Sequence, residues 1–113
     1  MPVQVMSPDD SLLAQSDGSD IHLIDTATSK NILTMNMGSD VLSLEYSTTH
    51  YWLLIVTQGQ IVVLDLESKY RLMEHPNTYQ AGKVTWSEEG DAVIYDYGCV
   101  VSELWPHPCL ISI

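Results

Sequence analysis

The sequence predicts an all-β fold made of three repeated units of short antiparallel strands. Two observations lead to this prediction. A polar turn that opens with serine after a large apolar residue recurs every forty positions, at Ser7, Ser47 and Ser87. Between such turns, β-branched and aromatic residues gather in short runs bounded by Gly, Pro, Asn, Asp and Ser, without helical periodicity. A period near forty residues indicates stacked β-units.

The first two units each contain four predicted strands. In the first unit these strands are residues 3–6, 12–15, 21–25 and 31–35, and in the second they are 41–46, 51–57, 60–65 and 70–73. Asp17-Gly18 supplies a turn in the first unit. Gln58-Gly59 is expected to form a two-residue hairpin turn in the second, with Gly59 at positive φ.

The third unit is predicted to have strands at 83–86, 92–95, 99–105 and 109–112. Four strands per unit are typical of a propeller blade, so we expect a partial β-propeller with blades at 1–37, 38–76 and 77–113. Three blades do not close a ring. The outer faces at 3–25 and 92–105 are therefore expected to be apolar and to need a cover, such as complementary blades, a second copy or the surface of a larger partner.

Composition argues against several classes of partner. Fifteen acidic and four basic residues give a net charge of −11, which repels nucleic-acid phosphates. The longest apolar runs are too short to cross a bilayer, so no membrane partner is expected. The first residues lack the pattern of a secretory signal, which favours a cytoplasmic location.

No arrangement of residues typical of catalysis or metal binding is present in the sequence. Asp9-Asp10 and Glu88-Glu89 follow serines in predicted turns, where solvated acids are common. His107 and Cys109 lie close together but lack the further ligands that a tetrahedral zinc site needs. We therefore predict a protein without enzymatic activity, cofactor or metal.

Some segments resemble a known family. Tyr-Trp-Leu-Leu at 51–54 and Leu-Asp-Leu-Glu at 64–67 resemble the sixth blade of the receptor for activated C kinase family, seven-bladed WD-repeat scaffolds of the eukaryotic small ribosomal subunit. Residues 7–12 resemble its fifth blade, and residues 84–90 its last. Ile24 and Leu64 replace the tryptophan of the Trp-Asp pair. The resemblance implies a WD40-type propeller segment matching three C-terminal blades, without the basic blades that help hold ribosomal RNA.

Aromatic residues in the predicted strands differ from those in the predicted loops. Those at repeat-aligned strand positions are expected to pack between blades rather than to anchor an interface; they are Tyr46, Trp52, Trp86, Tyr95 and Trp105. The connection 74–82 corresponds to a variable loop of the family and is our first candidate for a contact region. The candidate contact residues are Glu74, His75, Asn77 and Tyr79, together with Tyr97 beside another loop.

Two functions remain open at this point. The favoured one is a ribosome-associated cytoplasmic scaffold for translation or kinase signalling, with small-subunit ribosomal proteins and protein kinases as partners. The alternative is a structural propeller segment that completes a ring with a second chain and has no ribosomal role. Co-sedimentation with small ribosomal subunits separates the two.

Overall fold

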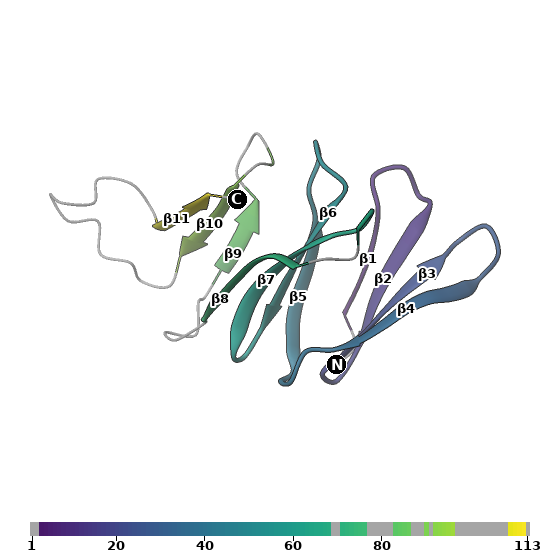
Figure 1. The fold of residues 1–113 in the computed structure, drawn as a ribbon, viewed down its shortest axis with the longest axis horizontal. Helices are drawn as coiled ribbons and strands as arrows, with labels where there is room; N and C mark the ends of the chain where they lie inside the picture. Colours follow the sequence, from purple (N-terminus) through teal and green to yellow (C-terminus); the bar gives the residue numbers. More distant parts are fainter. Residues whose placement is uncertain are drawn as a thin grey trace, which may run out of the picture.

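The computed structural model describes residues 3–68, 71–76, 83–86, 90, 92–96 and 109–112. Within these ranges the chain forms three antiparallel sheets that lie side by side along the long axis of the molecule (Figure 1). The strands are β1 (Gln4–Met6), β2 (Leu12–Asp17), β3 (Asp20–Asp25), β4 (Lys30–Asn36), β5 (Val41–Tyr46), β6 (Trp52–Thr57), β7 (Gln60–Asp65), β8 (Arg71–Pro76), β9 (Lys83–Trp86), β10 (Ala92–Asp96) and β11 (Cys109–Ser112). The predicted all-β class is confirmed. In the described part of the chain, no helix has the length and apolar character needed to span a membrane.

The first two sheets are the four-stranded units that the repeat predicted. Their strands pair in chain order, β1-β2-β3-β4 and β5-β6-β7-β8. Gly18-Ser19 joins β2 to β3, and Gln58-Gly59 joins β6 to β7. The predicted strands agree with the observed ones to within two residues at their ends, except at the end of β8.

β8 is longer than predicted and changes the position of two candidate contact residues. Glu74, His75 and Pro76 pair with β7, so they belong to a strand and not to a loop that starts at residue 74. Proline is tolerated there because β8 is the edge strand of its sheet and its outer side needs no N–H donor. The predicted loop boundary was wrong because hydrogen bonding to a neighbouring strand extends the sheet.

The turn at Gly59 lies where it was predicted, but its geometry differs. Gly59 does not have a positive φ. Its N–H instead donates to Thr57 Oγ1 at 3.2 Å and to Ser39 Oγ at 3.1 Å. A Cβ added at Gly59 would lie 3.2 Å from Ser39 Oγ. Glycine is therefore favoured at this position because Ser39 approaches it closely. The predicted positive φ was wrong.

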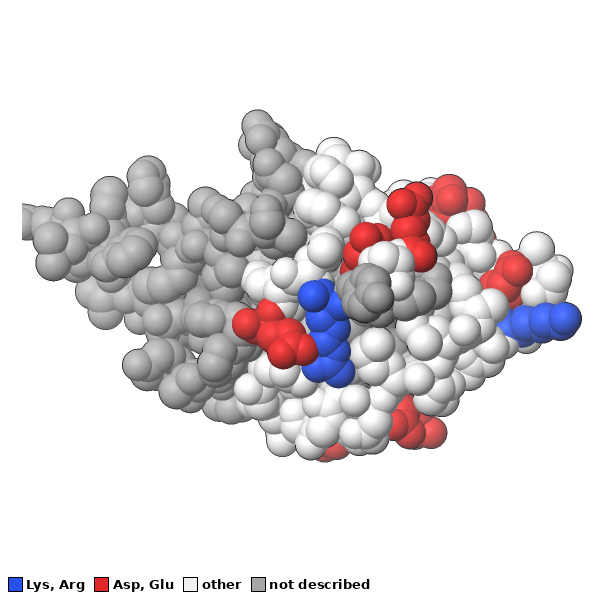
Figure 2. Space-filling model, viewed as in Figure 1, with Lys and Arg blue, Asp and Glu red and all other residues white. Residues whose placement is uncertain are grey.

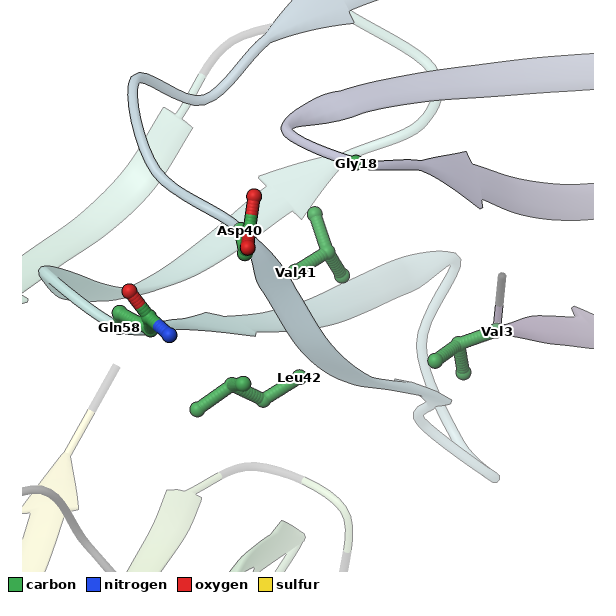
Figure 3. Close-up of a pocket in the computed structure, with 6 residues that line it drawn as sticks. All are labelled: Val3, Gly18, Asp40, Val41, Leu42 and Gln58. Carbon is green, nitrogen blue, oxygen red and sulfur yellow. The ribbon is translucent and has the colours of Figure 1, made fainter. Parts of the chain in front are cut away.

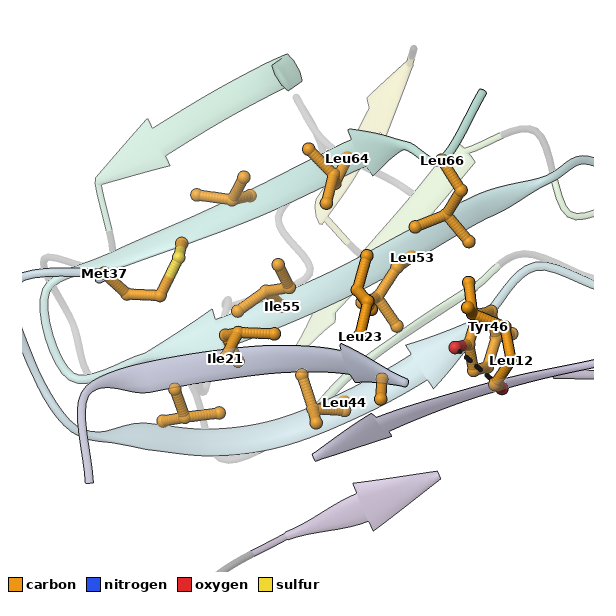
Figure 4. Packing of buried hydrophobic residues seen from close by; sticks show 13 residues of the cluster. Leu12, Ile21, Leu23, Met37, Leu44, Tyr46, Leu53, Ile55, Leu64 and Leu66 are labelled. Carbon is orange, nitrogen blue, oxygen red and sulfur yellow. Dashed lines mark hydrogen bonds between the residues drawn. The ribbon is translucent and has the colours of Figure 1, made fainter. Parts of the chain in front are cut away.

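The first hydrophobic core lies between the first and second sheets. We call the face of a sheet that looks toward the next unit its front face, and the opposite one its back face. The front face of the first sheet contributes Leu12, Ala14, Ile21 and Leu23, and the back face of the second contributes Leu44, Tyr46, Leu53, Ile55, Val62 and Leu64. Figure 4 shows these side chains meeting between the sheets, with Tyr46 Oη donating to the carbonyl of Leu12 at 3.1 Å. Burial of this area stabilises the pair of sheets.

A second core joins the front face of the second sheet to the third sheet. Its buried residues are Leu54, Val56, Ile61, Val63, Trp86 and Val93. Trp86, forty positions after Tyr46, also donates a hydrogen bond to the preceding sheet, but to a different place: its indole Nε1–H donates to the carbonyl of Glu45 at 3.0 Å. The predicted packing role is confirmed for Tyr46 and Trp86, and half-buried Trp52 stacks on Trp86. Trp105 and the side chain of Tyr95 lie outside the described residues.

The third sheet differs from the predicted four-stranded blade. Among the described residues it has three strands in the order β11-β10-β9. β11 pairs directly with β10, with Cys109 opposite Tyr95. A four-stranded meander would place the predicted strand 99–105 there, and that segment lies outside the described residues. The described fold is thus two complete four-stranded blades followed by a three-stranded sheet.

The back face of the first sheet is not the apolar surface that we expected. Gln15 Nε2 donates to Gln4 Oε1 at 3.3 Å, and His22 Nδ1 lies 3.0 Å from Thr34 Oγ1. These polar groups share the face with Met6, which is 43% exposed. Uncovered strands in this sheet therefore present a mixed surface to their surroundings.

Candidate protein-binding surfaces

The structure describes two of the five predicted contact residues. Glu74 is exposed on β8, where its carboxylate accepts from Arg71 Nη1 at 2.7 Å. His75 follows it in the same strand, opposite Ile61. Asn77, Tyr79 and Tyr97 lie outside the described residues. An exposed ion pair of this kind contributes little to stability, which leaves both of its charges available to a partner.

The linker between the first two sheets, residues 37–40, is held firmly from both sides. Toward the first sheet, Met37 N donates to the carbonyl of Ser19 at 2.8 Å, and Val41 N donates to that of Gly18 at 3.0 Å. Toward the second sheet, Gln58 N donates to the carbonyl of Asp40 at 3.1 Å. The linker is therefore tied to two turns, and its exposed side chains start from a fixed backbone.

A cavity of about 310 Å³ opens beside this linker, and we call it the linker cavity. It is lined by Val3, Gly18, Asp40, Val41, Leu42 and Gln58. Figure 3 shows Asp40 at the start of β5, with Val41 and Leu42 leaving the strand on opposite sides. Leu42 is 46% exposed and lies at a register shift in the pairing of β5 with β6. The bulge thus turns an apolar side chain outward next to an exposed carboxylate.

Sequence reasoning did not find the linker cavity, although a signal for it was present. Residues 37–40 precede the predicted loop residues 77–80 by one repeat of forty. A loop singled out in the third unit could therefore have been sought at the same place in the second. The missing information was the pair of flanking turns, which come close to the linker only when the sheets stack.

The opposite rim of the sheets carries the serine turns. Asp9 Oδ1 accepts from the Ser11 Oγ hydroxyl at 2.7 Å, from Ser7 Oγ at 2.7 Å and from Ser11 N at 3.1 Å. These hydrogen bonds favour the ionised carboxylate and lower the pKa of Asp9 from 3.8 to about 2. Asp9 lies in a turn, as predicted, and its carboxylate stabilises that turn through these hydrogen bonds.

A smaller cavity of about 200 Å³ lies between the first two serine turns, lined in part by Asp9, Thr49 and His50. His50 Nδ1 lies 2.9 Å from Thr49 Oγ1, and its ring stacks on Trp52 with centroids 4.0 Å apart. In a typical pair of nucleophile and base, a third group orients the base toward the nucleophile. The His50 ring is instead held by stacking on Trp52. In the described ranges, no three His, Cys, Asp or Glu residues are grouped to hold a metal.

The surface is strongly acidic. The net charge is −11, and Figure 2 shows more Asp and Glu than Lys and Arg side chains on the face that carries β4 and β8. Charge of one sign raises the encounter rate with oppositely charged partners and opposes binding to phosphate backbones. The arrangement is suited to basic protein surfaces.

Comparison with known proteins finds distant relatives of the chain. No family model matches it. Small ribosomal subunit protein RACK1 of Neurospora crassa is 30% identical over 112 residues, which cover 88% of this chain and 35% of that protein. RACK1z of Oryza sativa subsp. japonica is 31% identical over 101 residues, covering 81% of this chain and 30% of that protein. The chain is a distant RACK1 homologue. It spans about a third of the length of these curated relatives.

A fungal relative and two solved structures extend the comparison. MST50-interacting protein 11 of Pyricularia oryzae is 30% identical over 112 residues, covering 88% of this chain and 35% of that protein. A chain of a mitotic checkpoint complex matches 85% of this RACK1 homologue and 32% of its own length, with a TM-score of 0.70 and 19% identity. A chain of Kuenenia stuttgartiensis hydrazine synthase matches 84% and 29%, with a TM-score of 0.71 and 14% identity. At these identities the structures show the WD40 propeller fold alone, a fold that enzymes also use.

Proposed function

We propose that this RACK1 homologue is a non-catalytic scaffold that binds other proteins in the cytoplasm, in association with the small ribosomal subunit. The observation that carries the proposal is the similarity to RACK1 proteins over 88% of the chain. Small-subunit ribosomal proteins are the first class of partner proposed, and protein kinases are the second. Translation or kinase signalling is the corresponding process.

The geometry supports binding at loops and rims rather than on strand faces. The two cores use the front face of the first sheet and both faces of the second. Free surface is therefore found at the turns, the linker 37–40 and the outer strands. The net charge of −11 favours partners that present lysine and arginine.

The predicted contact region in the third unit remains part of the proposal. We place partner contacts at Asn77, Tyr79 and Tyr97, and at the neighbouring strand residues Glu74 and His75. The proposed blade boundaries stay at 1–37, 38–76 and 77–113. Under this division Glu74 and His75 belong to the end of the second blade, and Asn77, Tyr79 and Tyr97 belong to the third.

Co-sedimentation with small ribosomal subunits tests the proposal. The full chain is mixed with subunits purified from cells that lack RACK1 and centrifuged through sucrose at rising salt. We expect the chain to pellet with the subunits at low salt and to be displaced by an excess of RACK1 that carries a distinguishing tag. Leu53→Ala, which damages the first core, is the control for binding by unfolded chain.

Two results would contradict the ribosomal proposal. One is a folded chain that stays in the supernatant at every salt concentration, and the other is pelleting that RACK1 does not reduce. If the chain stays in the supernatant and elutes in a complex with further propeller blades, the alternative of a ring-completing segment is supported.

A further inference from the structure

The linker cavity combines a carboxylate with apolar side chains, and a single side chain from a partner can contact both. Asp40 offers an exposed carboxylate at its edge, and neither Lys30 nor Arg71, the two basic residues whose side chains the structure describes, forms an ion pair with it. Val3, Val41 and Leu42 supply apolar contact area in the same cavity. Lysine and arginine are the residues that carry a cation on an aliphatic stem, so they fit such a lining.

The cavity has the size for one side chain from a partner. Its volume of about 310 Å³ lies at the lower end of the range that small-molecule sites occupy. Gly18 contributes to the opening without a side chain, and a Cβ there would meet no atom within 4 Å. The space beside Gly18 therefore stays open for a group that enters from solvent.

The carboxylate is presented by a backbone that is already fixed. The Asp40 carbonyl accepts from Gln58 N, and the next residue donates to Gly18. Ser39 Oγ donates to Thr57 Oγ1 at 3.0 Å, which ties the linker to the end of β6. A site with a fixed backbone loses less conformational entropy on binding than a flexible loop does.

We infer that the linker cavity binds an arginine or lysine side chain presented by a protein partner. The stem lies against Val3 and Leu42, and the cation contacts the Asp40 carboxylate. This inference rests on the proposed function as a protein-binding scaffold and names the chemistry of one contact. It uses charge complementarity, because the chain carries a net charge of −11.

The test measures binding of three short peptides to the full chain by NMR. The probes are acetyl-Gly-X-Gly-amide peptides in which X is arginine, lysine or citrulline, the neutral analogue of arginine. We expect the arginine and lysine peptides to shift the amide signals of Val41 and Leu42, and the citrulline peptide to leave them unchanged. Binding should weaken from 50 to 300 mM salt, since the Debye length falls below about 10 Å over that range.

Two variants with the same change in charge locate the contact. Asp40→Asn should lower the affinity for the arginine peptide about fivefold, the range of a partly exposed ion pair. Asp10→Asn, on the opposite rim, should leave the affinity unchanged, and asparagine is compatible with the positive φ of 61° at that position. Leu42→Ser should weaken the arginine and lysine peptides alike through loss of the apolar wall.

Equal affinity of Asp40→Asn and the unchanged chain would overturn the inference, as would equal binding of the citrulline peptide. The outcome is separable from the ribosomal test. Co-sedimentation without peptide binding would contradict the inference about the linker cavity and support the proposed scaffold function. Peptide binding at Asp40 without co-sedimentation would support the inference about the cavity and contradict the ribosomal partner.

Discussion

The back faces of the first and second sheets occupy equivalent positions but differ in chemistry. At six positions forty residues apart, the first carries Gln4, Met6, Leu13, Gln15, His22 and Ile24, and the second carries Leu44, Tyr46, Leu53, Ile55, Val62 and Leu64. All six residues of the second face are buried, and none of the first is. Both sheets have the same strands at these positions. The two faces therefore differ in residue type and in burial, and not in secondary structure.

The polar groups of the first face satisfy one another in place of a neighbouring sheet. Asn31 Nδ2 lies 3.1 Å from His22 Nδ1 and donates to Thr34 Oγ1 at 3.0 Å. Covering this face with an apolar blade would remove these groups from water, which costs free energy unless new hydrogen bonds form. The two faces show how one repeat pattern produces a core surface in one unit and a mixed surface in the next.

The largest effect is expected from the matched leucines of the two faces. Leu53→Ala removes a fully buried side chain and should lower the free energy of unfolding by about 3 kcal/mol. Leu13→Ala, forty positions earlier on the half-buried face, should cost less than about 1 kcal/mol. Urea unfolding followed by tryptophan fluorescence measures both. Equal losses would mean that the first face is covered in the folded protein.

Substituting a glycine that contacts a neighbouring sheet should cost more stability than substituting a glycine in open space. Gly90, at φ 74°, lies against the second serine turn, where an added Cβ would come within 2.7 Å of Ser47 Oγ and 2.6 Å of Thr49 Oγ1. Gly90→Ala should cost about 2–3 kcal/mol, from backbone strain and displaced hydroxyls. Gly18→Ala, at φ 63° with open space around it, should cost about 1 kcal/mol. Thermal unfolding of the two variants ranks them, and a larger loss at Gly18 would contradict the assigned contact.

Acid should affect the first serine turn more than the second. Because the folded pKa of Asp9 is lowered to about 2 from 3.8, its contribution to stability is present above about pH 4 and is lost as the pH falls toward 2. The second turn has Thr49 at the aligned position, which does not titrate. Asp9→Asn should therefore flatten the fall in stability between pH 4 and pH 2 that the unchanged chain shows. An unaltered acid profile in Asp9→Asn would exclude the serine hydrogen bonds as its cause.

The smallest change in stability is expected when the first face is given the chemistry of the second. Gln15→Ile with His22→Val copies Ile55 and Val62 onto the exposed sheet. The free energy of unfolding should change by less than about 0.5 kcal/mol. Binding of a fluorescent apolar dye and self-association in light scattering should rise. A gain in stability of more than about 2 kcal/mol would show that another surface already covers this face.

Much of the fold could be predicted because the repeat and the strand pattern are local. The positions of Tyr46 and Trp86 in the two cores followed from their spacing of forty residues. The polar back face was missed because apolar residues were judged by strand, without separating the two faces of each strand. Gly59 was misjudged because Ser39, twenty positions away, determines its surroundings. Of the candidate contacts, Glu74 and His75 were assigned to the wrong element because pairing with β7 extends the strand.

The hydrogen bonds that cross between neighbouring sheets have a consequence for synthesis of the chain. They join residues 23 to 43 positions apart, from Val41 with Gly18 to Ser47 with Gly90. Because the entropy of loop closure grows only slowly with loop length, separations of this size add little to the cost of docking neighbouring sheets. A chain emerging from the ribosome can complete the contact between its first two sheets once Leu66 is available, before the third unit is translated. In such a stack each new sheet can dock onto a surface that is already formed.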